Sequence, residues 1–283
     1  MKLLRYGPKG QEKPGLLDAD MRVRSLADHV VDIDGALLAT GLDALRTLDP
    51  ATLPLVPEAE TARIAEPVAH VGKFLCIGLN YSDHAAEAGM PIPAEPILFT
   101  KATSAIIGPN DDVLLPPTST KSDWEVELGI VIGKEARYVT REAALSHVAG
   151  LCVVNDLSER EYQLERAGTW DKGKGCDTFG PFGPWLVTLD DIPDIANLPM
   201  WLDVNGVRMQ TGNTATMIFD VPYLVHYVSQ FMSLQPGDII STGTPPGVGM
   251  GMKPPVFLKE GDVMTLGIEG LGEQRQLVKR YGA

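Results

Sequence analysis

One segment, residues 123–133 (DWEVELGIVIG), has the pattern of a β-strand with two acidic residues on one face. Its apolar residues alternate and therefore share the other face: Val126, Leu128, Ile130 and Ile132. Glu125 and Glu127 lie one alternate-residue step apart, about 6.6 Å. Two carboxylates this close in an apolar run repel each other and are costly to desolvate, and a divalent cation between them would reverse that cost. The alternative is an exposed strand face, and the segment alone leaves both interpretations open.

Composition is that of a soluble globular protein: 283 residues, 44% hydrophobic and 22% charged. The net charge of −13 argues against nucleic acid and anionic membranes as partners, because binding to phosphate needs clustered Lys and Arg. No apolar run reaches the roughly 18 residues of a membrane helix, and MKLLRYG is too short for a secretory signal. The three cysteines lack CxxC spacing, which predicts free thiols in a reducing cytoplasm and makes structural zinc improbable.

The chain divides into two predicted parts. Residues 1–70 contain short strand signals and a helical stretch at 41–48, and they end in a connector rich in Pro, Ala and Glu. We therefore expect a small N-terminal α+β domain over 1–70 and a second, larger domain over 71–283.

The second part is expected to be β-rich. Short apolar runs separated by Gly, Pro, Asn and Asp predict strands at 73–79, 96–102, 126–133, 150–156, 184–188, 200–206, 238–243 and 263–268. Asn205-Gly206 predicts a hairpin, and helices are expected only at 140–149, 159–167 and 221–231. This is an α+β pattern with a sandwich, roll or barrel core. The absence of GxGxxG and Walker motifs disfavours a nucleotide-binding domain.

A third carboxylate, Asp156, ends the strand predicted at 150–156. In a sheet it could lie beside Glu125 and Glu127 and complete an oxygen cage, and hard oxygen ligands favour Mg²⁺ or Mn²⁺ over zinc. The alternative is that Asp156 caps the helix predicted from residue 159.

Three further segments contain residues suited to catalysis or binding. His84 and Glu87 are three residues apart, so a helical turn would place them on one face and make His84 a candidate base; an ordinary polar turn is the alternative. Lys174 lies in a glycine-rich loop and could reach an anionic site, although loop lysines are commonly just solvated. The loop that starts at Thr244 could hold a carboxylate, or it could be a stiff connector.

Taken in order, these segments resemble the fumarylacetoacetate hydrolase family. The matching segments are NYSDHAAE, the ExE of DWEVELGIVIG, CVVNDLSERE, KGKGCDTFGPFGP and DIISTGTPPGVG, and the similarity covers residues 73–270. The resemblance implies a β-roll catalytic domain, usually in a homodimer, with Mg²⁺ or Mn²⁺ held by Glu125, Glu127 and Asp156. It also implies a His84–Glu87 pair on a short lid helix, an active-site Lys174, and substrate-binding positions at Arg160, Gln163 and Thr244.

One position departs from the founding hydrolase. Asn80 stands where that enzyme has a fourth metal carboxylate, which resembles the smaller acylpyruvase-like branch and argues against fumarylacetoacetate as the substrate. The first 70 residues resemble bacterial members described as ureidoglycolate lyases or sugar-acid 2,4-diketo hydrolases.

The resulting hypothesis is a metal-dependent hydrolase that cleaves a C–C bond of a small anionic 2,4-diketo acid. A 2,4-diketo-3-deoxy sugar acid, such as a rhamnonate or fuconate derivative, would give pyruvate and a second acid such as lactate. The alternative is ureidoglycolate lysis or oxaloacetate decarboxylation at the same site. A catalytically silent metal-binding or assembly protein is the third possibility, and the five retained polar residues weigh against it because none of them is needed for folding.

Overall fold

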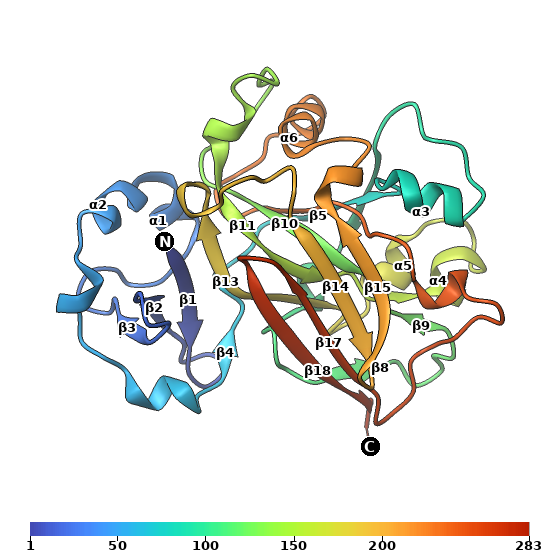
Figure 1. The fold of residues 1–283 in the computed structure, drawn as a ribbon, viewed down its shortest axis with the longest axis horizontal. Helices are drawn as coiled ribbons and strands as arrows, with labels where there is room; N and C mark the ends of the chain where they lie inside the picture. Colours follow the sequence, from blue (N-terminus) through green and yellow to red (C-terminus); the bar gives the residue numbers. More distant parts are fainter. Residues whose placement is uncertain (283) are drawn as a thin grey trace.

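The segment with the two glutamates lies in the middle of a large sheet in this structure, a computed structural model that describes residues 1–282 apart from the side chain of Glu60 (Figure 1). Most of its strands were predicted, and the β-rich α+β fold is confirmed. The order across the sheet is β3 (Val23–Ser25), β2 (Lys13–Leu17), β1 (Lys2–Tyr6), β13 (Gly180–Thr188), β11 (Val148–Asn155), β10 (Val126–Ile132), β16 (Ile239–Ser241), β5 (Phe74–Gly78) and β6 (Ile97–Lys101). Two short strands join it at the side: β4 (Ile64–Ala65) pairs with β1, and β7 (Ile106–Ile107) pairs with β13.

A second sheet lies in front of the first in Figure 1. Its strands, in spatial order, are β15 (Val207–Asn213), β14 (Pro199–Val204), β17 (Val263–Ile268), β18 (Gly272–Arg280) and β8 (Val113–Leu115). The predicted hairpin is confirmed: Asn205 and Gly206 join β14 to β15, and both have positive φ, 52° and 77°. A separate small ladder pairs β9 (Ser122–Asp123) with β12 (Ser158–Glu159).

Strand β10 is buried on both faces. Val126, Leu128 and Ile130 point into the core between the two sheets, where they meet apolar residues of β14 and β17. Val131, on the other face, belongs to a second core together with Val154 of β11. Because this second face is also closed to solvent, Glu127 on it is a buried carboxylate.

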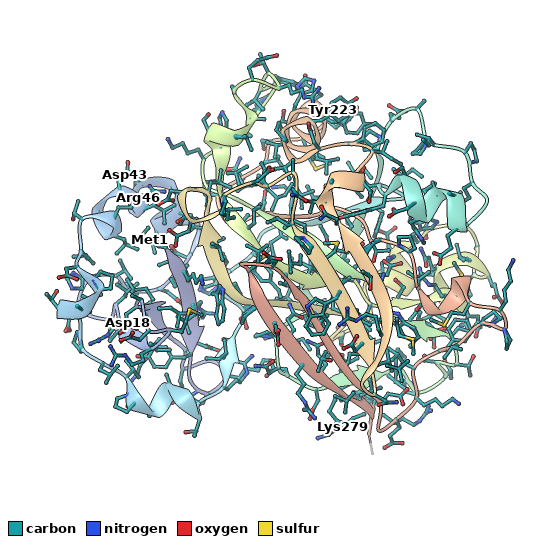
Figure 2. The ribbon with its side chains drawn as sticks, viewed as in Figure 1. Met1, Asp18, Asp43, Arg46, Tyr223 and Lys279 are labelled. Carbon is teal, nitrogen blue, oxygen red and sulfur yellow. The ribbon has the colours of Figure 1, made fainter. Side chains whose placement is uncertain are left out.

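The N-terminal part shares this second core and the large sheet. Strand β1 pairs with β13, and Leu3 packs in the same cluster as Phe74 and Phe182. Two short helices follow, α1 (Gly35–Thr40) and α2 (Leu42–Arg46), the second of which lies inside the stretch predicted as helical. Figure 2 shows Asp43 and Arg46 side by side on this part of the molecule, where they form an ion pair at 2.7 Å. The division of the chain at residue 70 stays a prediction.

The remaining helices are short: α3 (Ser82–Glu87), α4 (Arg160–Leu164), α5 (Asp171–Lys174) and α6 (Val221–Ser229). The prediction of a helix at 140–149 was wrong. A 3₁₀ turn, η4 (Ala144–His147), occupies its centre, and β11 begins at Val148, which pairs with Ile132 of β10. Pairing in the sheet therefore takes the last two residues of the predicted helix, Val148 and Ala149.

None of the helices formed by residues 1–282 has the length and apolar character needed to cross a membrane.

Candidate active site

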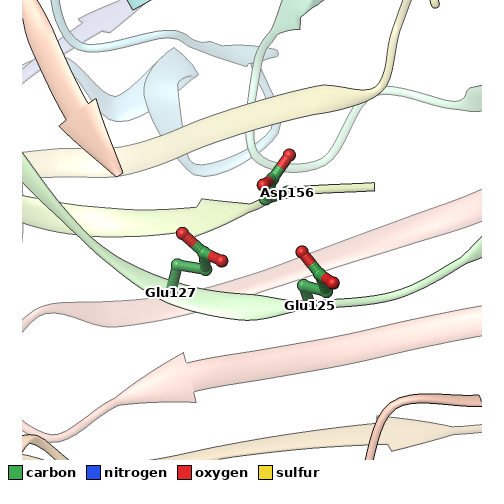
Figure 3. A group of neighbouring side chains, drawn as sticks. All are labelled: Glu125, Glu127 and Asp156. Carbon is green, nitrogen blue, oxygen red and sulfur yellow. The ribbon is translucent and has the colours of Figure 1, made fainter. Parts of the chain in front are cut away.

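The carboxylates of Glu125, Glu127 and Asp156, here called the acidic cluster, converge at one point (Figure 3). Glu125 directly precedes β10, Glu127 lies within it, and Asp156 directly follows β11, which runs antiparallel beside it. Each residue offers a ligand atom, and these atoms all lie within 4.8 Å of one another. The alternative of an exposed strand face is wrong, because the three residues are only 6%, 2% and 0% exposed.

Two lysines contact the acidic cluster. Lys174 Nζ donates to Glu125 Oε2 at 2.6 Å and to Asp156 Oδ2 at 2.7 Å. Lys101 Nζ, at the end of β6, donates to Asp156 Oδ1 at 2.6 Å and to the carbonyl of Leu157 at 2.9 Å. Both lysines are buried, so Lys174 is not a solvated loop lysine.

Arg160 supplies a third cation at the opposite side of Glu125. Its guanidinium donates to Glu125 Oε1 at 2.7 Å and, through Nε, to Asp123 Oδ2 at 2.9 Å. Asp123 also accepts from the backbone N–H groups of Gly249 and Met250, at 2.7 and 3.0 Å. Asp123 therefore fixes both Arg160 and the loop that covers this side of the site.

These contacts make the three carboxylates electrostatically unequal. Burial alone would raise the pKa of Glu125, but Lys174 and Arg160 together lower it to about 2. Burial raises the pKa of Glu127 well above its usual value, and the neighbouring Asp156 and Glu125 raise it further. Although burial disfavours the charged forms of Lys174 and Arg160, their carboxylate partners raise both pKa values, so both side chains remain cationic.

The interpretation of Asp156 as a helix cap is wrong. Helix α4 begins at Arg160, and its N-cap is Glu159, whose carboxylate accepts from the N–H of Glu161. Both oxygens of Asp156 are instead bonded to lysines. Its position at the end of β11 therefore serves the acidic cluster.

Helix α3 lies in the connection from β5 to β6, residues 79–96, here called the lid segment. His84 Nδ1 lies 3.1 Å from Glu87 Oε2, as the i,i+3 spacing predicted. The Glu87 carboxylate also accepts from the N–H of Gly247 at 3.1 Å, and Asp83 accepts from the hydroxyl of Thr216 at 3.2 Å. Glu87 thus holds one ring nitrogen of His84 and ties the lid segment to the loop after β16.

One cavity of about 260 Å³ joins the lid segment to the acidic cluster. All nine residues predicted for the site line it: His84, Glu87, Glu125, Glu127, Asp156, Arg160, Gln163, Lys174 and Thr244. The fold brings these nine residues together although they are far apart in the chain. They lie in the lid segment, at β10, at the end of β11, in α4, in α5 and in the loop after β16.

The polar groups at the three positions predicted to bind substrate already form hydrogen bonds within the protein. Arg160 is bonded to carboxylates, and it also donates to the side-chain oxygen of Gln163 at 3.1 Å. The Thr244 hydroxyl donates to the carbonyl of Val126 at 3.0 Å and accepts from Gln210 at 2.8 Å. Their roles toward a substrate stay predictions.

Asn80 has a structural role here. Its amide nitrogen donates to the carbonyls of Phe219 and Thr242, at 3.0 and 2.8 Å, and its oxygen accepts from the N–H of Phe219 at 2.8 Å. The side chain is fully buried and joins the start of the lid segment to two other loops.

The sequence did not single out Lys101 or Asp123. Lys101 ends an ordinary strand pattern, ILFTK, and its partner Asp156 is 55 residues away in the chain. Asp123 stands inside DWEVEL itself, two residues before Glu125, and a third acidic residue in the same alternation was the available signal for it.

The donor set fits a hard divalent cation. Three buried carboxylates with no Cys or His among them offer only oxygen ligands, which Mg²⁺ and Mn²⁺ prefer. A cation would also relieve the crowding of negative charge at Glu127, the carboxylate with the raised pKa.

Comparisons with known proteins agree with this geometry. A curated protein from Burkholderia lata with a provisional hydrolase name is 63% identical over 278 residues, 98% of each chain. The structure of 2-hydroxyhepta-2,4-diene-1,7-dioate isomerase from Mycobacterium marinum matches at 32% identity over 100% of each chain, with a TM-score of 0.76. Maleylpyruvate hydrolase from Sphingobium sp. SYK-6, solved with manganese(II) and pyruvate, matches at 30% identity over 99% of each chain, with a TM-score of 0.82. The sequence pattern described as fumarylacetoacetate (FAA) hydrolase C-terminal covers residues 73–279, and the chain belongs to this family.

Proposed function

We propose that this protein is a Mg²⁺- or Mn²⁺-dependent hydrolase that cleaves a C–C bond of an acylpyruvate-type 2,4-diketo acid, releasing pyruvate and a second acid. The observation that carries the proposal is the single cavity in which a buried acidic cluster, Lys174 and the His84–Glu87 pair meet. The manganese(II) and pyruvate in the related maleylpyruvate hydrolase support the same choice of metal and product.

Each polar residue has a distinct part in the proposed reaction. Glu125, Glu127 and Asp156 would hold the cation, which supplies Lewis-acid stabilisation for the carboxylate, the 2-oxo oxygen and the negative charge of the pyruvate fragment. Glu87 orients His84, which takes a proton from water as the water oxygen bonds to C4 of the substrate. The C3–C4 bond then breaks, and its electron pair stays on the pyruvate fragment as an enolate.

Lys174 is placed to neutralise that enolate. Its ammonium group already lies 2.6–2.7 Å from two carboxylates of the acidic cluster, and its raised pKa keeps it charged. The proton that His84 took from the water then goes to C3 of the enolate, which completes pyruvate and restores the base. The other fragment leaves as a carboxylic acid that carries the oxygen of the water.

The alternatives use the same cation without attack by water. Oxaloacetate decarboxylation passes through the pyruvate enolate and needs the cation and Lys174 but not a base at His84. Ureidoglycolate lysis breaks a C–N bond and forms no enolate, since the hydroxyl carbon becomes the carbonyl carbon of glyoxylate as urea leaves. The similarity to an isomerase that acts on a 2-hydroxydienoic diacid adds isomerisation to this group. The deoxy sugar-acid tail, the homodimer and the cytoplasmic location stay proposals from the family resemblance.

The test measures pyruvate release from acetylpyruvate and from oxaloacetate, with Mn²⁺ and with EDTA. We expect the wild type to cleave acetylpyruvate only with the metal. His84→Ala should lower this cleavage by about 10²–10⁴, as for a lost general base, and leave oxaloacetate decarboxylation much less affected. Lys174→Ala should lower both reactions, because both pass through the enolate.

Exchange of the charged exposed residue Arg208 for Lys is the matched control, because Arg208 lies on β15 outside the cavity. Undiminished acetylpyruvate cleavage in EDTA would show that the reaction does not need a metal ion. Undiminished cleavage by the His84→Ala variant would show that His84 is not the base. Oxaloacetate turnover with no acetylpyruvate cleavage would instead favour the decarboxylase.

A further inference from the structure

The cavity has a charged side and an apolar side. Five charged residues of the lining gather at the acidic cluster, and the other two, His84 and Glu87, form the pair on the lid segment. Much of the remaining wall is apolar, including Ile77, Ile97, Phe99, Trp170 and Val248. A substrate bound by its pyruvate end at the acidic cluster would therefore extend along apolar side chains.

Two aromatic rings form the part of this wall that starts beside Lys174. The Lys174 ammonium lies 5.0 Å from the centre of the Phe99 ring, and the Phe99 ring meets Trp170 edge to face at 5.2 Å and 64°. Trp170 rests directly on Gly78 of β5, where an added Cβ would lie 2.7 Å from Cζ3 of the indole. The missing Cβ of Gly78 thus leaves room for the indole to approach the strand closely, which places an aromatic surface near Lys174.

The mouth of the cavity is also apolar, and its side chains are incompletely buried. Met90 follows α3, Leu164 ends α4, and Met250 lies in the 3₁₀ turn η7 (Gly249–Gly251). They are 52%, 48% and 39% exposed. Apolar side chains from three separate elements that gather around one opening and remain exposed mark a binding surface for an apolar group.

The charged groups of the lining already have partners. Lys174 bonds Glu125 and Asp156, and Arg160 bonds Asp123, Glu125 and Gln163. A second carboxylate on the acyl tail would lose its water beside these apolar walls without gaining a cation there, and burial of an unpaired charge is costly. A polyhydroxylated tail would lose hydrogen bonds to water for the same reason.

We propose that the acyl group of the substrate is apolar, a short alkyl chain or an aromatic ring, and that it binds against Trp170 and Phe99 with Leu164, Met90 and Met250 closing over it. This inference rests on the proposed function and selects among its substrates: it favours alkanoyl- and aroylpyruvates over diketo acids with a carboxylate or sugar-like tail.

The first test compares kcat/KM for a series of acylpyruvates. From acetyl- to butanoyl- and hexanoylpyruvate we expect a rise of about fourfold for each methylene that becomes buried. Benzoylpyruvate should be a better substrate than acetylpyruvate, and succinylpyruvate and a 2,4-diketo-3-deoxy sugar acid should be worse. A flat series, or preference for the diacid or the sugar acid, would overturn the inference even if hydrolysis itself is observed.

The second test changes the wall. Trp170→Ala should lower kcat/KM for hexanoyl- and benzoylpyruvate by about tenfold or more, while acetylpyruvate, which does not reach the indole, reports that Lys174 is still in place. Leu164→Arg should lower hexanoylpyruvate cleavage and raise succinylpyruvate cleavage by about fivefold, as for an ion pair at a surface rim. Val207→Arg is the matched control, because Val207 is also an exposed apolar residue, on β15 and away from the cavity. Equal effects of Leu164→Arg and Val207→Arg would contradict the proposal.

Binding separates failure of this inference from failure of the proposed function. Calorimetry with Mn²⁺ should show N-hexyloxamate binding more tightly than oxamate, and Trp170→Ala should remove the difference. If no acylpyruvate is cleaved but this difference is seen, the apolar subsite stands and the hydrolase proposal falls. If oxamate and N-hexyloxamate bind with equal affinity, the proposal of an apolar subsite is wrong, whichever reaction the protein catalyses.

Discussion

Glu127 differs from the other two carboxylates of the acidic cluster in its partners. Glu125 and Asp156 are each bonded to cationic side chains, whereas Glu127 Oε2 accepts from the Ser241 hydroxyl at 2.6 Å and the Gly243 N–H at 2.8 Å. Crowding with Asp156 and Glu125 helps to raise the pKa of Glu127. Without metal, Glu127 therefore opposes folding, while Asp156 supports it through two lysines.

This asymmetry predicts opposite effects of two similar substitutions on the metal-free protein. Glu127→Gln removes a repelled charge and can keep both accepted hydrogen bonds, so we expect the melting temperature to rise by about 2–4 °C. Asp156→Asn removes the carboxylate partner of the buried Lys101 and one of the two carboxylate partners of Lys174, so we expect a loss of about 3 kcal/mol in the free energy of unfolding. Both should weaken Mn²⁺ binding. Thermal unfolding and calorimetric titration measure the two quantities, and a parallel fall in stability for both variants would contradict the charge balance described here.

At the level of single residues, the sequence was informative where a pattern was local. Glu125 and Glu127 alternate within one strand, and His84 and Glu87 are one helical turn apart, so spacing alone predicted that each pair shares a face. Lys101 and Asp156 come together only because β6 and β11 belong to one sheet. No local pattern encodes that distance, which is why Lys101 was missed.

The lid segment is the element whose position decides whether His84 reaches the cavity. Two hydrogen bonds between polar groups at the surface hold its helix: the Gly247 N–H donates to the Glu87 carboxylate, and the Thr216 hydroxyl donates to the Asp83 carboxylate. Within α3, Ala85 is the buried apolar residue. Tyr81, just before the helix, is fully buried in the core and anchors the start of the segment. The part after it is held by little apolar area and therefore opens at a low cost in free energy.

We therefore expect ligand to slow hydrogen exchange in residues 81–92. Mn²⁺ together with oxamate, a pyruvate analogue, should protect this segment, since His84 and Glu87 would close over the bound molecule. Helix α6 serves as the internal control, because it lies outside the cavity lining. Equal exchange with and without ligand, measured by mass spectrometry, would show that the lid segment does not respond to the site.

Among the elements, strands with apolar alternation were predicted and those with polar interiors were not. Strand β18 was missed because its buried positions include Gln274 and Gln276, which are 1% and 0% exposed. Their amides are bonded to the carbonyls of Val153 and Pro109 and to each other. Hydrogen bonds to other strands make this burial possible, and hydropathy does not report them.

At the scale of the whole molecule, the first 70 residues cover apolar surface of the rest. Strand β1 extends the large sheet beside β13, and Leu3, Leu16 and Leu26 share a core with Phe74 and Phe182. Arg46 on α2 also bonds Asp190 at 3.2 Å. Sequence composition suggested a boundary near residue 70, but composition does not show whether a core crosses it.

Because the core crosses residue 70, residues 71–283 produced alone should not unfold cooperatively. Removal of β1 exposes Phe74, Phe182 and an unpaired edge of β13, which favours aggregation. Calorimetry and size-exclusion chromatography, with the full chain as control, measure this. A soluble fragment with a sharp thermal transition and pyruvate-releasing activity would show that the predicted catalytic domain is self-sufficient.

The ends of the lid segment have a consequence for how this scaffold can diversify. The segment leaves the sheet after Gly78 and returns at Ile97, and these two residues are paired neighbours in β5 and β6. Insertions or deletions between them need not shift strand register, and each doubling of a flexible loop costs only about 0.6 kcal/mol. Relatives can therefore vary the part of the connection that follows Glu87, and with it Met90 and the closing surface, while His84, Glu87 and the acidic cluster stay in place. Substrate range can in this way change in a stretch of chain that contains none of the groups proposed to carry out the reaction.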